Sequence, residues 1–312
     1  MKVTVVGAGN VGATCADVIA HKELANEVIL LDIKPNFAEG KALDIWETSP
    51  INLYDTRVKG STEDYSKTAN SDVVVITSGL PRKPGMSRDD LISTNAAIVK
   101  TVTENVIRHS PNAIIIIVSN PLDVMTYCAY LTAKVDSSRV FGMAGILDTA
   151  RYRAFLAEAL NCSPKDIQAV LMGGHGDTMV PLPRYTTVGG IPVTELIGKA
   201  ELDAIVERTK KGGGEIVNLL GTSAWYAPGA AAAQMVEAVL RDQKRIFPVC
   251  AWLNGEYGLK NVYLGVPVKL GRKGIEQIIE LKLNADEMAL VNDSAKAVKE
   301  VMSVLDGMNI MA

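Results

Sequence analysis

This sequence has few of the residues that build metal sites and disulfides. It has four cysteines and three histidines in 312 residues, and no two cysteines form a Cys-x-x-Cys pair. The common zinc-binding patterns are therefore excluded, and cysteines scattered in this way are typical of reduced thiols in a cytoplasmic protein. We expect no metal ion and a cytoplasmic location. The four positions are Cys15, Cys128, Cys162 and Cys250.

Excess positive charge and long apolar runs are also missing. The formal net charge is −3, whereas a nucleic-acid partner would favour a basic surface. The longest purely aliphatic run, residues 113–118, is far too short to span a bilayer. The chain opens directly into the apolar segment Val3–Val6, without the basic and hydrophobic leader of a secretory signal. We therefore expect neither a nucleic-acid nor a membrane partner.

The first half of the chain alternates two kinds of apolar pattern. Short continuous runs rich in β-branched residues are typical of strands buried on both faces, and the longer stretches between them have helical periodicity. Such alternation predicts βαβ units, and so an α/β fold with a doubly wound parallel (Rossmann) sheet over residues 1–145. The expected strands are Val3–Val6, Val28–Leu31, Val73–Ile76 and Ile114–Val118, and the expected helices are Val11–His21, Phe37–Trp46 and Leu91–His109.

The second half, residues 146–312, predicts a mixed α+β substrate domain. Helical composition is followed by a β-meander, which is marked by glycine-containing turn signals. A long amphipathic helix with Leu290 in its apolar stripe then ends the pattern. The expected helices are 148–160, 201–220, 228–241 and 284–307, and the meander runs from 246 to 279.

The segment Gly7-Ala-Gly9-Asn-Val-Gly12 lies between the first expected strand and the first expected helix. There the first glycine allows a tight turn, the second lets the backbone approach a pyrophosphate, and the third allows close packing of helix on strand. Unpaired N–H groups at the helix N-terminus favour phosphates. A glycine-rich turn of this kind also occurs where FAD or another nucleotide binds, or where nothing does.

Asp32 narrows the choice of nucleotide. It ends the second expected strand, 20 positions after Gly12. An acidic side chain at that place accepts hydrogen bonds from ribose hydroxyls and repels a 2′-phosphate, which favours NAD over NADP. We therefore expect NAD as the cofactor.

His175 lies in Gly173-Gly-His-Gly-Asp177, and Asp148 and Arg151 lie in Asp-Thr-Ala-Arg. An imidazole, a carboxylate and a guanidinium are the groups needed to move a proton on a substrate that carries a carboxylate. A neutral imidazole accepts a hydroxyl proton and the imidazolium returns it, so His175 is the expected acid–base group. Asp148 and Arg151 share one face of a helix that begins there. The alternatives are a core histidine, an N-cap aspartate and a surface salt bridge.

Two further segments carry polar groups of interest. Arg82 and Arg88 lie in a stretch punctuated by proline and glycine, residues 79–88, whose composition suits a mobile lid. Asn120 follows an expected strand, at the carboxyl end of the sheet where ligands bind. A solvated basic loop is the alternative for the two arginines.

Together these motifs resemble the lactate/malate dehydrogenase superfamily, and within it the lactate-dehydrogenase-like bacterial enzymes that act on malate. The resemblance runs from residue 1 to about residue 307. It implies NAD-dependent, reversible hydride transfer on a 2-hydroxy acid, with His175 as proton acceptor and donor. It also implies a homo-oligomer, a tetramer rather than a dimer, and the apolar helix expected over Phe37–Trp46 agrees with this.

The resemblance assigns roles residue by residue. Asp148 bonds the other ring nitrogen of His175 and so fixes its tautomer. Arg151 grips the substrate C1 carboxylate through a two-pronged pair, and Arg88 closes over the substrate carbonyl. Asn120 contacts the substrate hydroxyl and the cofactor, and the resemblance suggests a cis bond between Asn120 and Pro121, which the sequence itself leaves open. The implied cofactor-binding set is Gly7, Ala8, Gly9, Asn10, Val11, Gly12, Asp32, Asn95, Val118 and Asn120.

The expected substrate depends on Arg82. In lactate dehydrogenases the matching lid position is typically glutamine, whereas a guanidinium offers a second anion site. Closing the lid over pyruvate would leave Arg82 desolvated and unpaired, at a cost of about 2–5 kcal/mol, or roughly thirty- to several-thousand-fold in discrimination. We therefore expect a dicarboxylate pair, (S)-malate and oxaloacetate. The segment Gly221–Trp225 is a second place that can touch the substrate side chain, and a difference there would broaden the specificity.

Three alternatives stay open. The nearest is a lactate dehydrogenase or another 2-hydroxyacid dehydrogenase. A dinucleotide-binding sensor without turnover would require a damaged catalytic set, yet the sequence retains all of its members. A nucleotide-binding sheet that serves methyl transfer is compatible with Asp32 but has no use for His175 and the arginines. The retained catalytic set is His175, Asp148, Arg151 and Arg88.

Overall fold

The computed structural model describes residues 1–81 and 87–308. Its described part is built on a nine-stranded sheet in the order β14-β13-β12-β6-β5-β4-β1-β2-β3. Six neighbouring strands run parallel, and the other three extend the sheet antiparallel from β6. The parallel strands are β1 (Lys2–Val6), β2 (Glu27–Asp32), β3 (Arg57–Thr62), β4 (Val73–Ile76), β5 (Ile114–Ile117) and β6 (Val140–Gly142), and the antiparallel ones are β12 (Arg245–Asn254), β13 (Lys260–Gly271) and β14 (Gly274–Ile278).

The central parallel strands form from the continuous apolar runs of the sequence. Every residue of β4 and β5 is buried, as expected for strands that are covered on both faces. Val3 of β1 pairs with Val28 of β2 on one side and with Val73 of β4 on the other. The chain therefore winds outward from β1 in both directions, which confirms the predicted doubly wound sheet and brings the carboxyl ends of its strands to one edge.

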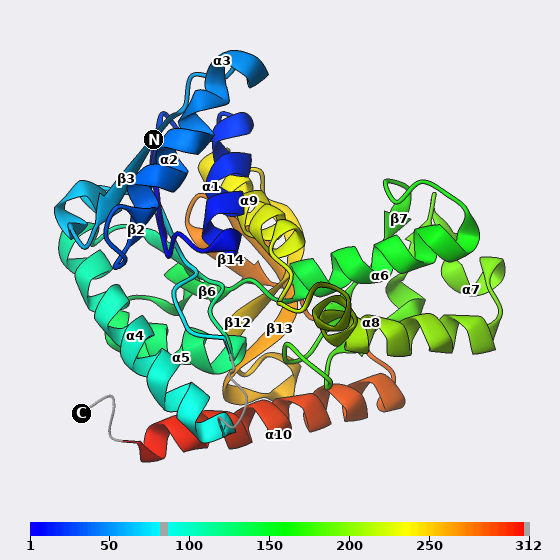
Figure 1. The fold of residues 1–312 in the computed structure, drawn as a ribbon. Coiled ribbons are helices and arrows are strands. Elements are labelled where there is room, and N and C mark those ends of the chain that lie inside the picture. The colour runs from blue at the N-terminus through cyan, green and yellow to red at the C-terminus, as the bar shows by residue number, and fades with distance from the viewer. Residues whose placement is uncertain (82–86, 309–312) are drawn as a thin grey trace.

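Two pairs of helices cover the sheet. α1 packs against α9 on one face, and α4 packs against α5 on the other (Figure 1). α1 buries Cys15, Ala16 and Ile19, whose spacing gives the helix one apolar face. The bounds are α1 (Asn10–His21), α2 (Phe37–Glu47), α3 (Ser49–Asn52), α4 (Arg88–His109), α5 (Leu122–Ala133) and α9 (Tyr226–Leu240).

A second lobe projects from the sheet. In Figure 1, α6 and α8 lie side by side in it, and they share a separate apolar core that includes Tyr152, Leu156 and Ile205. α10 contacts α4, α5 and β13 along the lower edge of the same view. The remaining bounds are α6 (Gly145–Leu160), β7 (Ile167–Gln168), β8 (Leu171–Met172), β9 (Val180–Pro181), β10 (Thr187–Val188), β11 (Ile191–Pro192), α7 (Val193–Leu196), α8 (Lys199–Leu220) and α10 (Ala285–Gly307), with 3₁₀ turns at Tyr65–Thr68, Ser137–Arg139, Pro183–Tyr185 and Glu256–Gly258.

Four elements of the first half, apart from its 3₁₀ turns, were not predicted: α3, β3, β6 and α5. α3 has only four residues and buries none of them. β3, an edge strand, alternates exposed and buried residues irregularly and has a polar sequence. β6 has only three residues. α5 is almost wholly buried, so it has no polar face by which a helical period is recognised.

Two details of the prediction are wrong. Asp148 is not the N-cap of α6, because the helix begins at Gly145 after an Ala144 cap, and Asp148 lies buried in the first turn. Leu290 lies outside the buried stripe of α10 and is exposed, whereas Val291 beside it is fully buried.

The predicted meander is confirmed, but its three strands complete the sheet begun by the first half. The boundary expected between residues 145 and 146 stays a prediction. Within residues 1–81 and 87–308, no helix is long and apolar enough to cross a membrane.

Candidate active site

An imidazole, a carboxylate and a guanidinium lie together at one place, which we call the His175 corner. It consists of His175, Asp148 and Arg151. His175 lies in the loop between β8 and β9, and its Nδ1 is 2.9 Å from Oδ2 of Asp148. The other oxygen of Asp148 lies 3.3 Å from Nη1 of Arg151, one turn further along α6. The side chain of Asp148 is 3% exposed, that of Arg151 11% and that of His175 23%. The spatial grouping expected from the sequence is therefore present.

The contact with Asp148 defines which nitrogen of His175 is free to exchange a proton. A carboxylate only accepts hydrogen bonds, so Nδ1 donates and Nε2 is left for another partner. The charge of Asp148 raises the pKa of His175 above its ordinary value, while burial and the charge of Arg151 lower it. Asp148 thus stabilises the charged imidazole, and histidine is a side chain suited to accept a proton and to return it.

The glycines around His175 serve packing more than ligand approach. A Cβ on Gly174 would lie 2.6 Å from Cγ2 of Val298, so only glycine lets the loop pack against α10. Gly176 faces open space. Of the two glycines that flank His175, only Gly176 therefore leaves open space beside the loop.

Arg151 is positioned by a glycine of the neighbouring helix. Gly212 lies in α8, and a Cβ there would be 2.2 Å from Cδ and 2.7 Å from Nε of Arg151. The guanidinium stem therefore passes directly over the backbone of α8 toward Asp148. The run Gly212–Gly214 inside a helical pattern was the available sequence signal, since glycine inside a helix costs about 1 kcal/mol and usually has a packing reason.

A cavity of about 370 Å³ opens beside the His175 corner. Arg88 lines it from the first residue of α4, where Ser87 caps the helix through Asp90. Arg82, the other arginine of the expected lid, lies outside the described residues. Gly221–Trp225 does not line this cavity. The residues that line the cavity are Arg88, Pro121, Leu122, Asp123, Val124, Gly174, His175, Gly176, Asp177, Thr178, Ala297, Val298 and Val301.

Asn120 and Asn95 are joined at the carboxyl end of β5. Nδ2 of Asn95 donates to the Asn120 carbonyl at 2.7 Å and to the Leu80 carbonyl at 3.1 Å, while its Oδ1 accepts from the Leu80 N–H at 2.8 Å. Asn95 is buried and thus ties the base of the expected lid to the Asn120 segment, and Asn120 itself is exposed. The peptide bond between Asn120 and Pro121 is cis, the isomer that the resemblance suggests. A direct contact between Asn95 and the cofactor stays a prediction.

The nucleotide turn, residues 7–12, fits a dinucleotide diphosphate. A Cβ on Gly12 would lie 1.8 Å from the Gly7 carbonyl oxygen, so α1 approaches β1 as only glycine permits. Gly9 faces open space, and it precedes α1 with no side-chain cap and no acidic residue in the first turn. The N-terminal amides of α1 therefore point to an uncovered space that favours an anion.

Asp32 stands beside this turn at the end of β2. Its Oδ2 accepts from the Ala8 N–H at 2.7 Å and its Oδ1 from the Lys34 N–H at 3.0 Å. These two amides fix the carboxylate at the carboxyl edge of the sheet. A carboxylate held there accepts ribose hydroxyls and opposes a 2′-phosphate.

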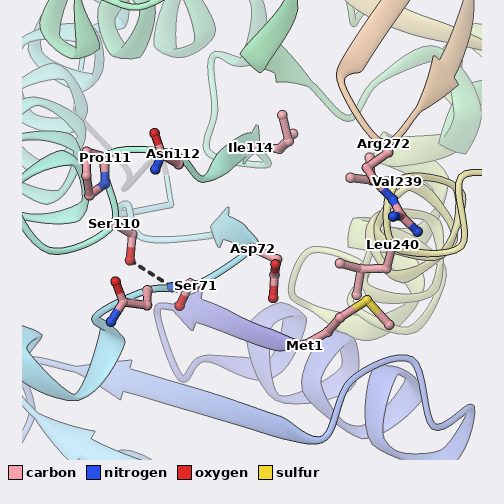
Figure 2. A pocket seen from close by; sticks show the side chains of 11 residues that line it. Met1, Ser71, Asp72, Ser110, Pro111, Asn112, Ile114, Val239, Leu240 and Arg272 are labelled. Atoms are coloured by element: carbon pink, nitrogen blue, oxygen red, sulfur yellow. Dashed lines mark hydrogen bonds between the residues drawn. The ribbon is translucent and has the colours of Figure 1, made fainter.

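A second cavity, of about 400 Å³, lies at the opposite edge of the sheet (Figure 2). It is lined where the parallel strands begin, by Met1, Asp72 and Ile114, together with Arg272 from the turn after β13. Ligands of such sheets bind at the carboxyl ends of the strands, so this cavity is not the nucleotide site. Among the described residues, no group of three or more His, Cys, Asp or Glu is arranged to hold a metal ion.

Comparison with known proteins agrees with this geometry. Two family models match: the lactate/malate dehydrogenase NAD binding domain over residues 1–142, and the lactate/malate dehydrogenase alpha/beta C-terminal domain over residues 146–305. The chain therefore belongs to the lactate/malate dehydrogenase family. It is an oxidoreductase whose cofactor is NAD, which confirms both the resemblance and the cofactor expected from the sequence.

Individual relatives match nearly the whole chain. A malate dehydrogenase of Cytophaga hutchinsonii is 73% identical over 308 residues, which are 99% of each chain. The solved malate dehydrogenase of Salinibacter ruber is 57% identical with a TM-score of 0.95, covering 99% of this chain and 98% of that one. A lactate dehydrogenase of Eimeria maxima, solved with NADH and oxamate, is 43% identical with a TM-score of 0.93. The match covers 98% of this chain and 94% of that one.

Proposed function

We propose that this protein is a malate dehydrogenase that catalyses the reversible conversion of (S)-malate and NAD to oxaloacetate, NADH and a proton. The observation that carries the proposal is the His175 corner, where one buried carboxylate holds a proton acceptor and a guanidinium side by side. A 2-hydroxy acid presents a hydroxyl group next to a carboxylate, so its two polar groups match these two side chains. The 73% identical relative named malate dehydrogenase supports the same activity.

In the oxidative direction, Nε2 of His175 accepts the hydroxyl proton of the substrate. Asp148 holds Nδ1–H and stabilises the imidazolium that forms, since it lies 2.9 Å away. Arg151 pairs with the C1 carboxylate and orients the substrate, because a guanidinium fork matches a carboxylate in two places. NAD, when bound, would supply the hydride acceptor for the substrate carbon. In reverse, the imidazolium returns the proton to the carbonyl oxygen.

Residues at the carboxyl edge of the sheet would bind NAD and contact the reacting oxygen of the substrate. The nucleotide turn and the N-terminal amides of α1 would bind the diphosphate of NAD, and Asp32 its ribose. Val118, just after β5, lies half-buried at the same edge. Asn120 would contact the substrate hydroxyl, and Arg88 would stabilise charge on the carbonyl oxygen from its place in the cavity wall.

The choice of malate over lactate rests on Arg82. The fold does not decide between them, because the chain is similar to a lactate dehydrogenase at a TM-score of 0.93. A guanidinium at position 82 provides the partner for the second carboxylate of oxaloacetate, whereas pyruvate would leave it unpaired. Such an unpaired buried charge costs about 2–5 kcal/mol.

We also propose a homo-oligomer, a tetramer rather than a dimer, located in the cytoplasm. Leu43, Ile51 and Leu53 of the α2–α3 region are 58%, 77% and 85% exposed. Apolar side chains gathered on neighbouring helices favour association with another copy. Light scattering of the purified protein would give a mass of four chains, and the mass of one chain would contradict the proposal.

The activity is tested by the rate of NADH oxidation with oxaloacetate and with pyruvate. The proposal predicts a strong preference for oxaloacetate. A preference for pyruvate would retain the hydride chemistry and refute the assigned substrate. Tight NADH binding without turnover on either substrate would favour a dinucleotide-binding sensor.

A further inference from the structure

The loop that carries His175 is fastened from three sides. Gly173 exchanges backbone hydrogen bonds with Gly265 of β13, at 2.9 and 3.1 Å. The Gly174 N–H donates to Oγ of Ser294 in α10 at 2.9 Å. The backbone N–H of His175 donates to Oδ2 of Asp123 at 3.0 Å. Only the last of these fastenings is made by an acidic side chain.

Asp123 is placed to act as a buried carboxylate. It is the second residue of α5, a position where the helix dipole favours negative charge. The whole residue is 8% exposed. Its Oδ1 lies 3.2 Å from Sγ of Cys250 in β12, so each oxygen accepts a hydrogen bond and neither is positioned to donate one. Burial raises the pKa of Asp123, but the Cys250 thiol and the His175 N–H oppose that rise.

We propose that Asp123 is a positioning residue for His175: it anchors the loop through the His175 N–H and places a second negative charge behind the imidazole. This rests on the acid–base function proposed above for His175. Asp148 and Asp123 thus approach His175 from two elements, α6 and α5, one through the ring and the other through the backbone. The charge of Asp123 raises the pKa of His175 in the same direction as that of Asp148.

Several other groups face this site and bear on its titration. Arg151 opposes the two carboxylates and lowers the pKa of His175. α10 contributes no charged side chain to the cavity wall, only Ala297, Val298 and Val301. The ionisable groups at this site are Asp148 and Arg151 from α6, Asp123 from α5, Cys250 from β12, Arg88 from α4 and Asp177 from the loop itself.

The test is a magnetic-resonance titration of His175 in histidine-labelled full-length protein. The chain has only three histidines, and the His175 signal is assigned by its absence from His175→Asn. Asp123→Asn keeps an oxygen that accepts the His175 N–H but removes the charge. We expect the midpoint of the His175 titration to move toward acid by about half a pH unit or more.

Ser294→Ala is the matched control. It removes the side chain that fastens the neighbouring residue of the same loop, Gly174, and changes no charge. The proposal predicts that its His175 midpoint equals that of the wild type. An unmoved midpoint in Asp123→Asn, or an equal shift in Ser294→Ala, would overturn the proposal. If Asp123→Asn does not fold, Asp123→Ser provides a smaller neutral acceptor for the same comparison.

Activity gives an independent second readout. The acid limb of kcat/KM for malate oxidation should move to lower pH in Asp123→Asn, because oxidation requires neutral His175. If the wild type does not oxidise malate, the proposed function fails. The titration needs no turnover, so it still decides whether Asp123 acts on His175.

Discussion

The nucleotide turn and the His175 corner are built in opposite ways. The turn, residues 7–12, is one continuous segment that we expect to bind through its backbone amides, and its key residues are glycines, which have no side chain. The corner uses the side chains of His175, Asp148 and Arg151, which the fold gathers from two elements, with Asp123 behind them from a third. Substitutions in the corner should therefore change chemistry without changing nucleotide affinity, and the following predictions test that separation.

The largest effect is expected for His175→Asn. Loss of the acid–base group should lower kcat by about 10²- to 10⁴-fold. NADH affinity, measured by fluorescence titration, should stay near that of the wild type, because the nucleotide turn lies on other segments. A variant with an intact rate would remove His175 from the mechanism, and lost NADH binding would break the separation of the two regions.

Arg82→Gln extends the comparison to the expected lid. Removing the second anion site should reduce the preference for oxaloacetate over pyruvate, expressed as a ratio of kcat/KM, by roughly thirty- to several-thousand-fold. Steady-state rates with both substrates measure it. An unchanged ratio would refute the role of Arg82 and direct attention to Gly221–Trp225.

Gly212→Ala tests how the corner is supported from α8. The new methyl group would displace the stem of Arg151, from which it would be only 2.2 Å away. We expect kcat/KM to fall by about 10- to 100-fold, mainly through KM, because a displaced clamp misplaces the substrate. Gly213→Ala is the matched control, since a Cβ there meets nothing within 4 Å. Equal losses in both variants would indicate a general effect on α8.

The smallest effect concerns stability and pH. The folded protein raises the pKa of His175, chiefly through Asp148, so the charged pair stabilises the fold fully below the ordinary histidine pKa of about 6.5. That contribution is lost as the pH rises through the raised value. The difference in melting temperature between wild type and Asp148→Asn should therefore be larger at acid pH than at alkaline pH. A difference that is constant or grows with pH would contradict the pairing.

The same contrast explains what the sequence alone could predict. The nucleotide turn is local, so its glycines and Asp32 were singled out from their spacing. The strands that consist of continuous apolar runs were likewise predicted from local sequence. β3 was missed because it is a polar edge strand, β6 because it has only three residues, and α5 because it has no polar face that would reveal a helical period. Asp123 was missed because its partner, the loop of His175, is distant in the chain, and a carboxylate in an apolar segment gives no sign of the loop that it fastens.

The start of α6 shows how a local pattern can mislead. The helix was expected from residue 148, which left an N-cap as the alternative for Asp148, but it begins three residues earlier and the carboxylate contacts His175 and Arg151. The packing of α6 against the β8–β9 loop brings the carboxylate of Asp148 to His175, and the sequence near Asp148 does not reveal that packing. The grouping of His175 with Asp148 and Arg151 was nevertheless predictable, because the expected acid–base chemistry requires these partners and the sequence contains them.

The most direct test is the structure of the complex with NADH and (S)-malate, a pair that cannot react because both members are reduced. The account predicts the C1 carboxylate on the guanidinium of Arg151 and the hydroxyl group within hydrogen-bond distance of Nε2 of His175, with Asp148 still on Nδ1. A malate molecule bound away from His175, or one whose hydroxyl faces a different side chain, would contradict it.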